Sequence, residues 1–176
     1  MTTTLAIANQ KGGVAKTTTV ASLGAALAEL GQRVLLVDLD PQACLTFSLG
    51  IDPEDLELSV HHVLTKGLPP AEAVIQTDDG VDLLPATIEL ARAEADLLTR
   101  TGREHVMRMA VDELPADAPY DWILLDCPPS LGVLTVAALT AADGVLIPLQ
   151  CETLSHRGVG QLLDTCLLYT SDAADE

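Results

Sequence analysis

The sequence predicts an α/β fold of three layers, in which helices cover both faces of an open, mainly parallel sheet. Short apolar runs such as residues 34–37 alternate along the chain with longer segments of helical periodicity, which is typical of βαβ units. Hydrophobic residues make up 48% of the chain and aromatic residues only 2%. We therefore expect a core of Val, Leu, Ile and Ala, which suits buried parallel strands.

The expected elements follow one another with short connections. Apolar runs predict strands at residues 5–8, 34–37, 81–84, 122–125 and 145–149. Helical spacing predicts helices at residues 17–30, 59–66, 70–76, 89–99, 104–114 and 133–141, and a last helix from about residue 155. Residues 38–50 are expected to form a loop.

Composition excludes several classes of protein. The formal net charge is −17, which argues against strong nucleic-acid binding by this stretch as a whole. The sequence shows no basic leader segment, and its apolar runs are too short to span a bilayer. The cysteines at 44, 127, 151 and 166 have neither metal-ligand nor disulfide spacing. We therefore expect a cytoplasmic protein with reduced thiols and no membrane partner.

The first chemical motif is Lys11-Gly-Gly-Val-Ala-Lys-Thr-Thr18, between a predicted strand and a predicted helix. Small residues let backbone N–H groups approach phosphate oxygens, and the helix N-terminus adds a favourable dipole. Lys16 can neutralise phosphate charge, and the Thr17 hydroxyl can coordinate Mg²⁺. This context favours a phosphate-binding loop over a simple glycine turn. The residues expected to bind nucleotide are Gly12, Gly13, Val14, Ala15, Lys16, Thr17 and Thr18.

Two further motifs place carboxylates at the ends of predicted strands. Asp38 and Asp40 follow the second strand directly, where they can serve Mg²⁺-bound water and an attacking water; taken alone, a solvated acidic turn is the better interpretation. Asp126 ends a run of apolar residues, the arrangement of a Walker B motif that orients Mg²⁺. The predicted metal-site residues are Thr17, Asp38 and Asp126. Cys127 is expected to be a core or spacer residue.

Together the motifs resemble the ParA family of partitioning ATPases, which has a P-loop NTPase fold. The phosphate loop has the variant form of the ParA and MinD group, with an extra lysine at Lys11. Residues 38–42 resemble ParA more than MinD, and residues 145–152 also resemble ParA. In that group the early lysine reaches the partner's phosphates in a nucleotide-sandwich dimer. The resemblance implies that Lys11, Lys16 and Asp40 are catalytic, and that Lys11 is exposed and unpaired in the monomer.

The resemblance also implies the cofactors and partners. It implies Mg²⁺-dependent ATP hydrolysis that switches a homodimer on and off nucleoid DNA, stimulated by a ParB-like protein. Non-specific DNA would bind through segments beyond residue 165. A MinD-like ATPase that positions itself on a membrane and a non-catalytic nucleotide-dependent scaffold remain alternatives. Ala15 replaces the family's glycine, and its methyl group is expected to require a negative φ.

The two ends of the chain differ in what they resemble. Residues 1–165 match a P-loop ATPase domain of the ParA type, whereas the family continues for several more strands and helices. Residues 166–176 instead match an in-frame translation of a common transposase-based sequencing adapter. We therefore expect the fold to be incomplete on its C-terminal side, with a non-native tail.

Overall fold

The computed structural model describes residues 2–115, 120–150 and 155–171. Within them, one six-stranded sheet has the order β3–β4–β2–β5–β1–β6. Its strands are β1 (Thr3–Ile7), β2 (Val34–Asp38), β3 (Ile75–Gln76), β4 (Asp82–Leu84), β5 (Trp122–Asp126) and β6 (Gly144–Leu146). All neighbouring pairs are parallel except β3 and β4. The predicted mainly parallel sheet is confirmed.

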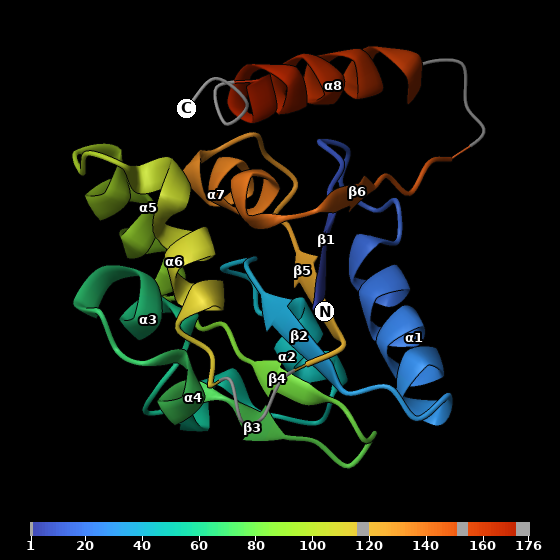
Figure 1. The fold of residues 1–176 in the computed structure, drawn as a ribbon, viewed down its shortest axis with the longest axis vertical. Coiled ribbons are helices and arrows are strands. Elements are labelled where there is room, and N and C mark those ends of the chain that lie inside the picture. Colours follow the sequence, from blue (N-terminus) through green and yellow to red (C-terminus); the bar gives the residue numbers. More distant parts are fainter. Residues whose placement is uncertain (1, 116–119, 151–154, 172–176) are drawn as a thin grey trace.

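Helices cover both faces of this sheet (Figure 1). The α-helices are α1 (Lys16–Glu29), α2 (Cys44–Ser48), α3 (Val60–Lys66), α4 (Pro70–Ala73), α5 (Leu90–Leu98), α6 (Val106–Asp112), α7 (Val133–Ala141) and α8 (Ser155–Ser171). Two short 3-10 helices, η1 (Pro53–Asp55) and η2 (Arg103–His105), lie between them. None of these described helices is long and apolar enough to cross a membrane.

The hydrophobic core is divided by the sheet into two parts. Because successive side chains of a strand point to opposite faces, Leu36 and Leu124 pack with α1 on one face. Leu35 and Ile123 pack on the other face, with the helices α3, α5, α6 and α7. Every residue of β2 is buried. This explains why residues 34–37 are continuously apolar instead of alternating.

Three predicted segments differ from the structure. Residues 38–50 contain the helix α2, and residues 70–76 end in the strand β3. Residues 104–114 form part of η2 followed by α6. The strand β3 is only two residues long, and the turn that returns it to β4 depends on Gly80, whose φ is 74°. Such short elements are determined by tertiary contacts more than by local pattern.

The last helix, α8, lies beyond α7 and β6 (Figure 1). Leu162 on this helix is buried, whereas Leu163, Leu167 and Leu168 are at least half exposed. Residues 166–171 continue α8, and the rest of the segment attributed to the adapter lies outside the described residues. The assignment of a non-native tail therefore stays a prediction.

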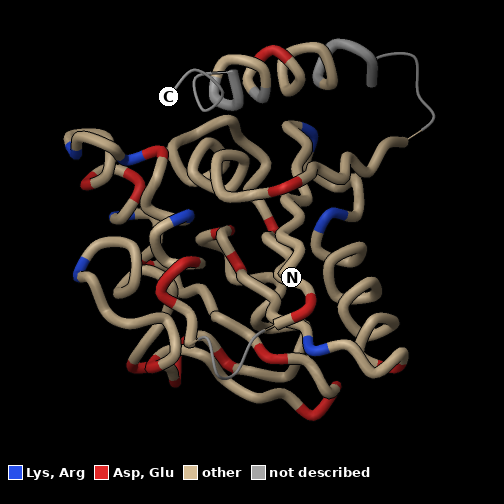
Figure 2. The backbone as a smooth tube through the Cα atoms, viewed as in Figure 1, with Lys and Arg blue, Asp and Glu red and all other residues tan. Residues whose placement is uncertain are grey.

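Acidic residues are spread over most of the molecule, and basic residues are sparse (Figure 2). The turn between β3 and β4 carries Asp78 and Asp79, and η1 carries Glu54 and Asp55. The surface of the described chain thus reflects the strongly negative net charge of the sequence.

Candidate functional site

The predicted site residues lie at the carboxyl ends of three neighbouring strands. In the centre of the sheet, β5 lies between β1 and β2. Asp126 at the end of β5 is in register with Ile7 of β1 and with Asp38 of β2. The prediction that the strand ending at Asp126 lies beside the first strand is confirmed. Ligands of parallel α/β sheets commonly bind at this edge.

The phosphate loop connects β1 to α1 and turns sharply. Gly13 has a φ of 74°, and Val14 is buried beneath the loop. Lys16 begins α1 and is only 8% exposed. Its Nζ atom donates a long hydrogen bond of 3.5 Å to the carbonyl oxygen of Lys11. The Lys16 ammonium therefore lies over the loop instead of in the hydrophobic core.

Ala15 adopts a conformation that differs from the one expected from its sequence. Its φ is 64° and its ψ is 31°, so the expectation of a negative φ is wrong. The reason is that Ala15 caps α1, and its carbonyl oxygen accepts hydrogen bonds from the Thr19 amide at 2.9 Å and the Thr19 hydroxyl at 2.7 Å. A left-handed conformation costs a non-glycine residue roughly 1–2 kcal/mol. Ala43, the cap of α2, has a φ of 51° and is strained similarly.

Asp38 is fully buried and is held by several donors. Its Oδ1 accepts from the Asp40 amide at 3.1 Å, and its Oδ2 accepts from the Thr46 amide at 2.9 Å and the Thr46 hydroxyl at 2.8 Å. The Thr46 hydroxyl also accepts a bond from the Ala86 amide at 3.0 Å. Burial raises the pKa of Asp38 to about 6, although the hydrogen bonds from Thr46 act in the opposite direction.

Asp40 lies at the start of the turn between β2 and α2. Its side chain is half-buried, and its Oδ1 accepts a hydrogen bond from the Gln42 amide at 2.9 Å. The Asp40 amide is at the same time bonded to Asp38. The Asp38 carboxylate therefore fixes the turn that carries Asp40, through its hydrogen bond from the Asp40 amide.

Asp126 is also buried, but its two carboxylate oxygens have no hydrogen-bond partner among the described residues. Burial raises the pKa of Asp126 to about 7, and the neighbouring Asp38 raises it further, whereas Thr17 and Lys16 partly offset these effects. A buried carboxylate without a partner is costly unless a cation neutralises it. Asp126 together with Thr17 provides the oxygen ligands that suit Mg²⁺.

Protein side chains alone do not complete a metal site here. Within residues 2–115, 120–150 and 155–171, no group of three or more His, Cys, Asp or Glu side chains could hold a metal ion. Mg²⁺ commonly binds to one or two carboxylates together with water and substrate phosphates. The arrangement therefore fits a metal that arrives with a nucleotide. Cys127 is buried, as expected of a core residue.

Three residues that the sequence analysis gave no role hold the site together. Thr46 engages Asp38, as described above. Asn9 accepts a bond from the Lys11 amide at 3.0 Å and donates one to the Pro148 carbonyl at 2.8 Å. Gln150 accepts a bond of 3.0 Å from Lys11 Nζ. The expectation that Lys11 is unpaired is therefore wrong, because the segment after β6 provides it with a partner within the same chain.

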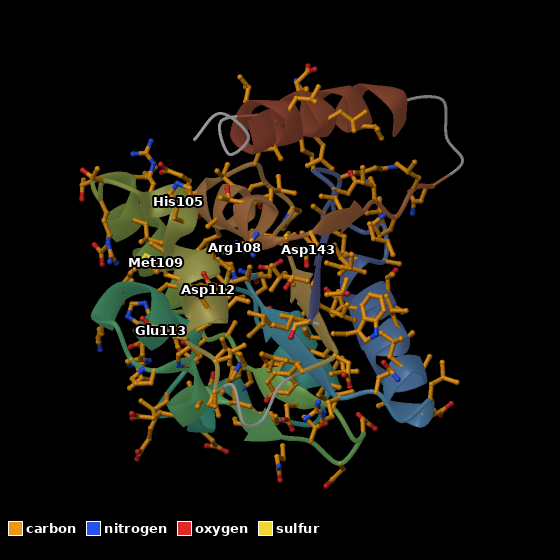
Figure 3. All side chains as sticks on the ribbon, viewed as in Figure 1. His105, Arg108, Met109, Asp112, Glu113 and Asp143 are labelled. Carbon is orange, nitrogen blue, oxygen red and sulfur yellow. The ribbon has the colours of Figure 1, made fainter. Side chains whose placement is uncertain are left out.

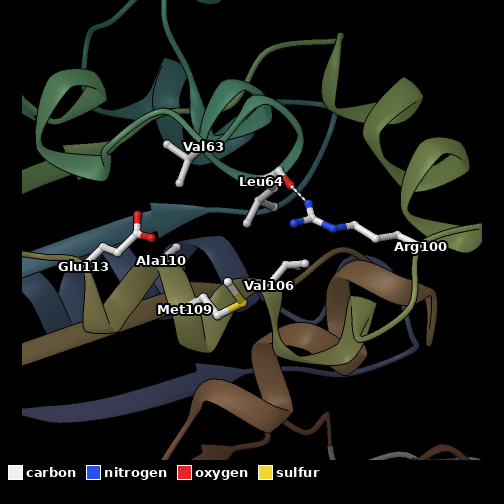
Figure 4. Close-up of a pocket in the computed structure, with 8 residues that line it drawn as sticks. Val63, Leu64, Arg100, Val106, Met109, Ala110 and Glu113 are labelled. Carbon is white, nitrogen blue, oxygen red and sulfur yellow. Dashed lines mark hydrogen bonds between the residues drawn. The ribbon is translucent and has the colours of Figure 1, made fainter.

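A hollow lies between α3 and α6, away from the strand ends that carry the candidate site (Figure 4). It is lined mainly by apolar side chains, and Arg100 closes one side by donating a hydrogen bond of 3.1 Å to the Leu64 carbonyl. Met109 on α6 and Glu113 at its C-terminal end border it, and Figure 3 labels both beside that helix. This hollow shares no residue with the phosphate loop.

Comparison with known proteins identifies the family. Residues 2–173 match the family model described as an AAA domain. Soj, the sporulation initiation inhibitor protein of Bacillus subtilis, is 47% identical over 165 residues, which are 93% of this chain and 64% of Soj. The chromosome partitioning protein ParA of Caulobacter vibrioides is 46% identical over 162 residues, covering 92% of this chain and 61% of ParA. The chain thus spans less than two thirds of these relatives.

Solved structures give the same fold. A Mycobacterium smegmatis protein described as cobyrinic acid a,c-diamide synthase, with bound ATP analogue and magnesium, is 63% identical with a TM-score of 0.89. The alignment covers 94% of this chain and 67% of that protein. An ATP complex of a Cyanothece McdA variant is 29% identical with a TM-score of 0.84, covering 93% of this chain and 62% of McdA. The chain belongs to the AAA-domain family of P-loop proteins, in which Soj and the chromosome partitioning protein ParA are its homologues.

Proposed function

We propose that the full-length protein is a ParA-like ATPase that hydrolyses ATP with Mg²⁺ and acts in chromosome or plasmid partitioning. One observation carries this proposal. The phosphate loop, the Asp40 turn and the unpartnered Asp126 carboxylate meet at adjoining ends of β1, β2 and β5. The relatives with bound ATP or ATP analogue and magnesium support it.

Each residue of the site has a role in this proposal. The phosphate loop from Gly12 to Thr18 binds the nucleotide, and Lys16 offsets the charge of the phosphates. Thr17 and Asp126 would hold Mg²⁺, which when bound neutralises the charge that develops on the phosphoryl oxygens. Asp38 supports this metal site, because its hydrogen bonds to Asp40 and Thr46 fix the turn beside Asp126.

Asp40 is proposed to position the water that attacks the γ-phosphate. It lies on a turn at the rim of the site and not within the phosphate loop. In the full-length protein, Asp40→Ala is expected to retain ATP affinity and to lower turnover by about 10²–10⁴-fold. Equilibrium binding of ATP and steady-state phosphate release measure the two quantities separately. An equal loss of affinity and turnover would contradict the role.

Lys11 is proposed to contact the nucleotide of a second subunit and so to couple ATP binding to homodimer formation. Lys16 already serves the phosphates within one subunit, so a second lysine adds most across a dimer. Lys11→Ala is expected to leave ATP binding nearly intact and to remove ATP-dependent dimerisation and hydrolysis. Sedimentation with a slowly hydrolysed ATP analogue tests this. A dimer as stable as the wild-type dimer would rule the role out.

The partners of the whole protein are proposals of the same kind. The dimer would bind nucleoid DNA non-specifically through segments beyond residue 165, and a ParB-like protein would stimulate hydrolysis. The negative charge of the described surface is consistent with a DNA-binding surface that lies elsewhere in the full-length protein. DNA co-sedimentation with and without ATP, in buffers of increasing salt, tests this proposal.

The name of the Mycobacterium smegmatis relative suggests a second candidate function, amide synthesis on a carboxylic acid. Such a reaction needs a carboxylic acid and a nitrogen donor in addition to ATP. Phosphate release by the purified full-length protein without either compound supports the partitioning ATPase. Release that depends on both compounds supports the synthase. ATP binding without phosphate release would indicate a nucleotide-dependent scaffold, and ATP-dependent binding to lipid vesicles a MinD-like protein.

Residues 166–176 are proposed to be a non-native extension of the domain formed by residues 1–165. Leu167 and Leu168 are each about two-thirds exposed, as expected for residues that were not selected to pack against this fold. Resequencing of the source gene is expected to show a different continuation after residue 165. The same tail in an independent clone would contradict the proposal.

A further inference from the structure

We infer that Gln150 is a positioning residue, which holds the Lys11 side chain against its own subunit. ATP-dependent dimerisation breaks this contact and releases Lys11. The inference rests on the proposed role of Lys11 across a dimer and adds a step to it. Gln150 lies in the segment that follows β6, far from Lys11 in sequence but next to it in space.

The amide group of Gln150 contacts the phosphate loop through both of its polar atoms. Gln150 Oε1 accepts a hydrogen bond from Lys11 Nζ at 3.0 Å. Gln150 Nε2 donates to the carbonyl oxygen of Gly13 at 3.1 Å. The bond to Gly13 fixes which end of the amide is directed toward Lys11, because only the oxygen end can accept a hydrogen bond from an ammonium group.

A second amide fastens the same two segments. Asn9 Nδ2 donates to the Pro148 carbonyl at 2.8 Å, and Asn9 Oδ1 accepts from the Lys11 amide at 3.0 Å. Asn9 is only 8% exposed, so this connection is better protected from water than the contact of Gln150. The segment after β6 is therefore held beside the phosphate loop independently of Gln150. The Gln150 amide is therefore not needed to hold this segment in place, and its oxygen can serve as the acceptor for Lys11 Nζ.

The hydrogen bond between Lys11 and Gln150 is of the kind that can be exchanged. Both side chains are exposed, and an exposed contact of a charged side chain contributes only about a two- to fivefold bias in an equilibrium. A lysine that lies against Gln150 of its own chain does not extend toward a second subunit. Dimerisation must therefore break this contact. The contact then lowers the apparent affinity of one subunit for another by about the same two- to fivefold factor.

Two substitutions at the same position separate this role from simple support of the loop. Gln150→Ala and Gln150→Glu both remove the donor that bonds the Gly13 carbonyl. They have opposite effects on Lys11, because alanine removes the acceptor and glutamate replaces it with a carboxylate, which binds an ammonium group more strongly. Support of the loop predicts changes in the same direction, and retention of Lys11 predicts changes in opposite directions.

The first measurement is competitive acylation of lysines in the nucleotide-free full-length protein, read by peptide mass spectrometry. Lys66, which is exposed and lies at the end of α3, is the internal reference. Relative to Lys66, Lys11 is expected to react about two- to fivefold faster in the Gln150→Ala protein than in the wild type. In the Gln150→Glu protein it is expected to react more slowly. Equal reactivity of Lys11 in all three proteins would overturn the inference.

The second measurement is the dissociation constant of the dimer formed with a slowly hydrolysed ATP analogue, by sedimentation. The Gln150→Ala dimer is expected to be about two- to fivefold tighter than the wild-type dimer, and the Gln150→Glu dimer weaker. If both variants weaken the dimer, Gln150 only supports the phosphate loop and the inference is wrong. A Lys11→Ala protein that dimerises normally would refute the proposed function, whereas the acylation result reports on the Lys11–Gln150 contact regardless of dimerisation.

Discussion

The ends of β2 and β5 carry two aspartates that are neighbours in the sheet but have opposite surroundings. Asp38 and Asp126 are in register, and each is at most 1% exposed. Three groups donate hydrogen bonds to the Asp38 carboxylate. Neither oxygen of Asp126 has a partner among the described residues. The protein thus provides hydrogen-bond donors to the Asp38 carboxylate but not to the Asp126 carboxylate, although the two residues occupy equivalent places in the sheet.

We propose that this difference separates a carboxylate that stabilises the fold from one that is available to a ligand. The bonds to Asp38 connect β2 to the Asp40 turn, and Thr46 extends them to the end of β4 through the Ala86 amide. The Asp126 carboxylate has no hydrogen-bond partner within the described chain, yet it lies beside Thr17 and Lys16. A substitution at Asp38 is therefore expected to affect mainly folding, and one at Asp126 mainly metal-dependent chemistry.

The largest effect is expected from Asp126→Asn in the full-length protein. Loss of the carboxylate that would hold Mg²⁺ is expected to lower ATP hydrolysis by about 10²-fold or more. The free energy of unfolding at pH 8 is expected to equal or exceed that of the wild type, because a buried charge without a partner is removed. Phosphate release and urea unfolding measure the two effects. A strongly destabilised variant would show that Asp126 has a structural role after all.

Asp38→Ala, in contrast to Asp126→Asn, is expected to lower the free energy of unfolding. Removing the carboxylate leaves the Asp40 amide and the Thr46 amide and hydroxyl without their acceptor, which is expected to cost about 2–4 kcal/mol in the free energy of unfolding. Thr46→Ser is the matched control, because it retains the hydroxyl group and is expected to change stability much less. If Asp38→Ala unfolds at the wild-type urea concentration, the structural assignment of Asp38 is wrong.

The pH dependence of stability is expected to reflect both aspartates. Their pKa values in the folded state, about 6 for Asp38 and about 7 for Asp126, lie above the ordinary value of 3.8. As pH rises from 4 to 7, the unfolded state loses these protons first and is favoured. The free energy of unfolding of the ligand-free protein is therefore expected to fall by roughly 6 kcal/mol over this interval.

Urea unfolding at pH 4.5, 6 and 8 checks this dependence. The Asp126→Asn protein is the control, because it lacks the group with the higher pKa and is expected to show a shallower decrease. Stability that rises with pH over this interval in the wild type would contradict the raised pKa values of these two buried carboxylates.

Much of the site could be predicted because it lies in continuous motifs at strand ends. The loop from Lys11 to Thr18 and the aspartates at 38, 40 and 126 each follow an apolar run, and the parallel sheet brings those ends together. The surroundings of the two aspartates could not be predicted. Thr46 bonds both to the Asp38 carboxylate and to an amide 40 residues further along the chain, a contact that no local pattern indicates.

The contacts of the phosphate loop were missed for a similar reason. Gln150 bonds residues more than 130 positions earlier in the chain, and Asn9 bonds Pro148 across a similar separation. Helix α2 and strand β3 are too short for their periodicity to be recognised. The cost of a left-handed alanine favours a negative φ at Ala15, whereas the structure has a φ of 64° there, with hydrogen bonds from Thr19 to the Ala15 carbonyl.

The smallest effect is expected from Ala15→Gly, at the loop that faces Asp126. Ala15 has a φ of 64°, and glycine adopts this conformation without the cost of a Cβ atom. The substitution is expected to raise the free energy of unfolding by about 0.5–1 kcal/mol. Ala43→Gly is expected to raise the free energy of unfolding by a similar amount at the Asp40 turn, because the φ of Ala43 is 51°. Urea unfolding measures both changes.

Ala26→Gly is the matched control, because Ala26 is an exposed residue within α1. The same chemical change there is expected to lower stability by about 0.5–1 kcal/mol. If Ala15→Gly destabilised the protein as Ala26→Gly does, Ala15 would not be strained.

The most direct test of the contrast between the two aspartates is the affinity for ATP with and without Mg²⁺. It is measured by equilibrium binding for the full-length wild-type and Asp126→Asn proteins. The wild type is expected to bind ATP more tightly when Mg²⁺ is present, whereas the variant is expected to retain the Mg²⁺-free affinity and to lose the increase. An equal increase in both proteins would show that Asp126 does not hold the metal, and the central claim would be wrong.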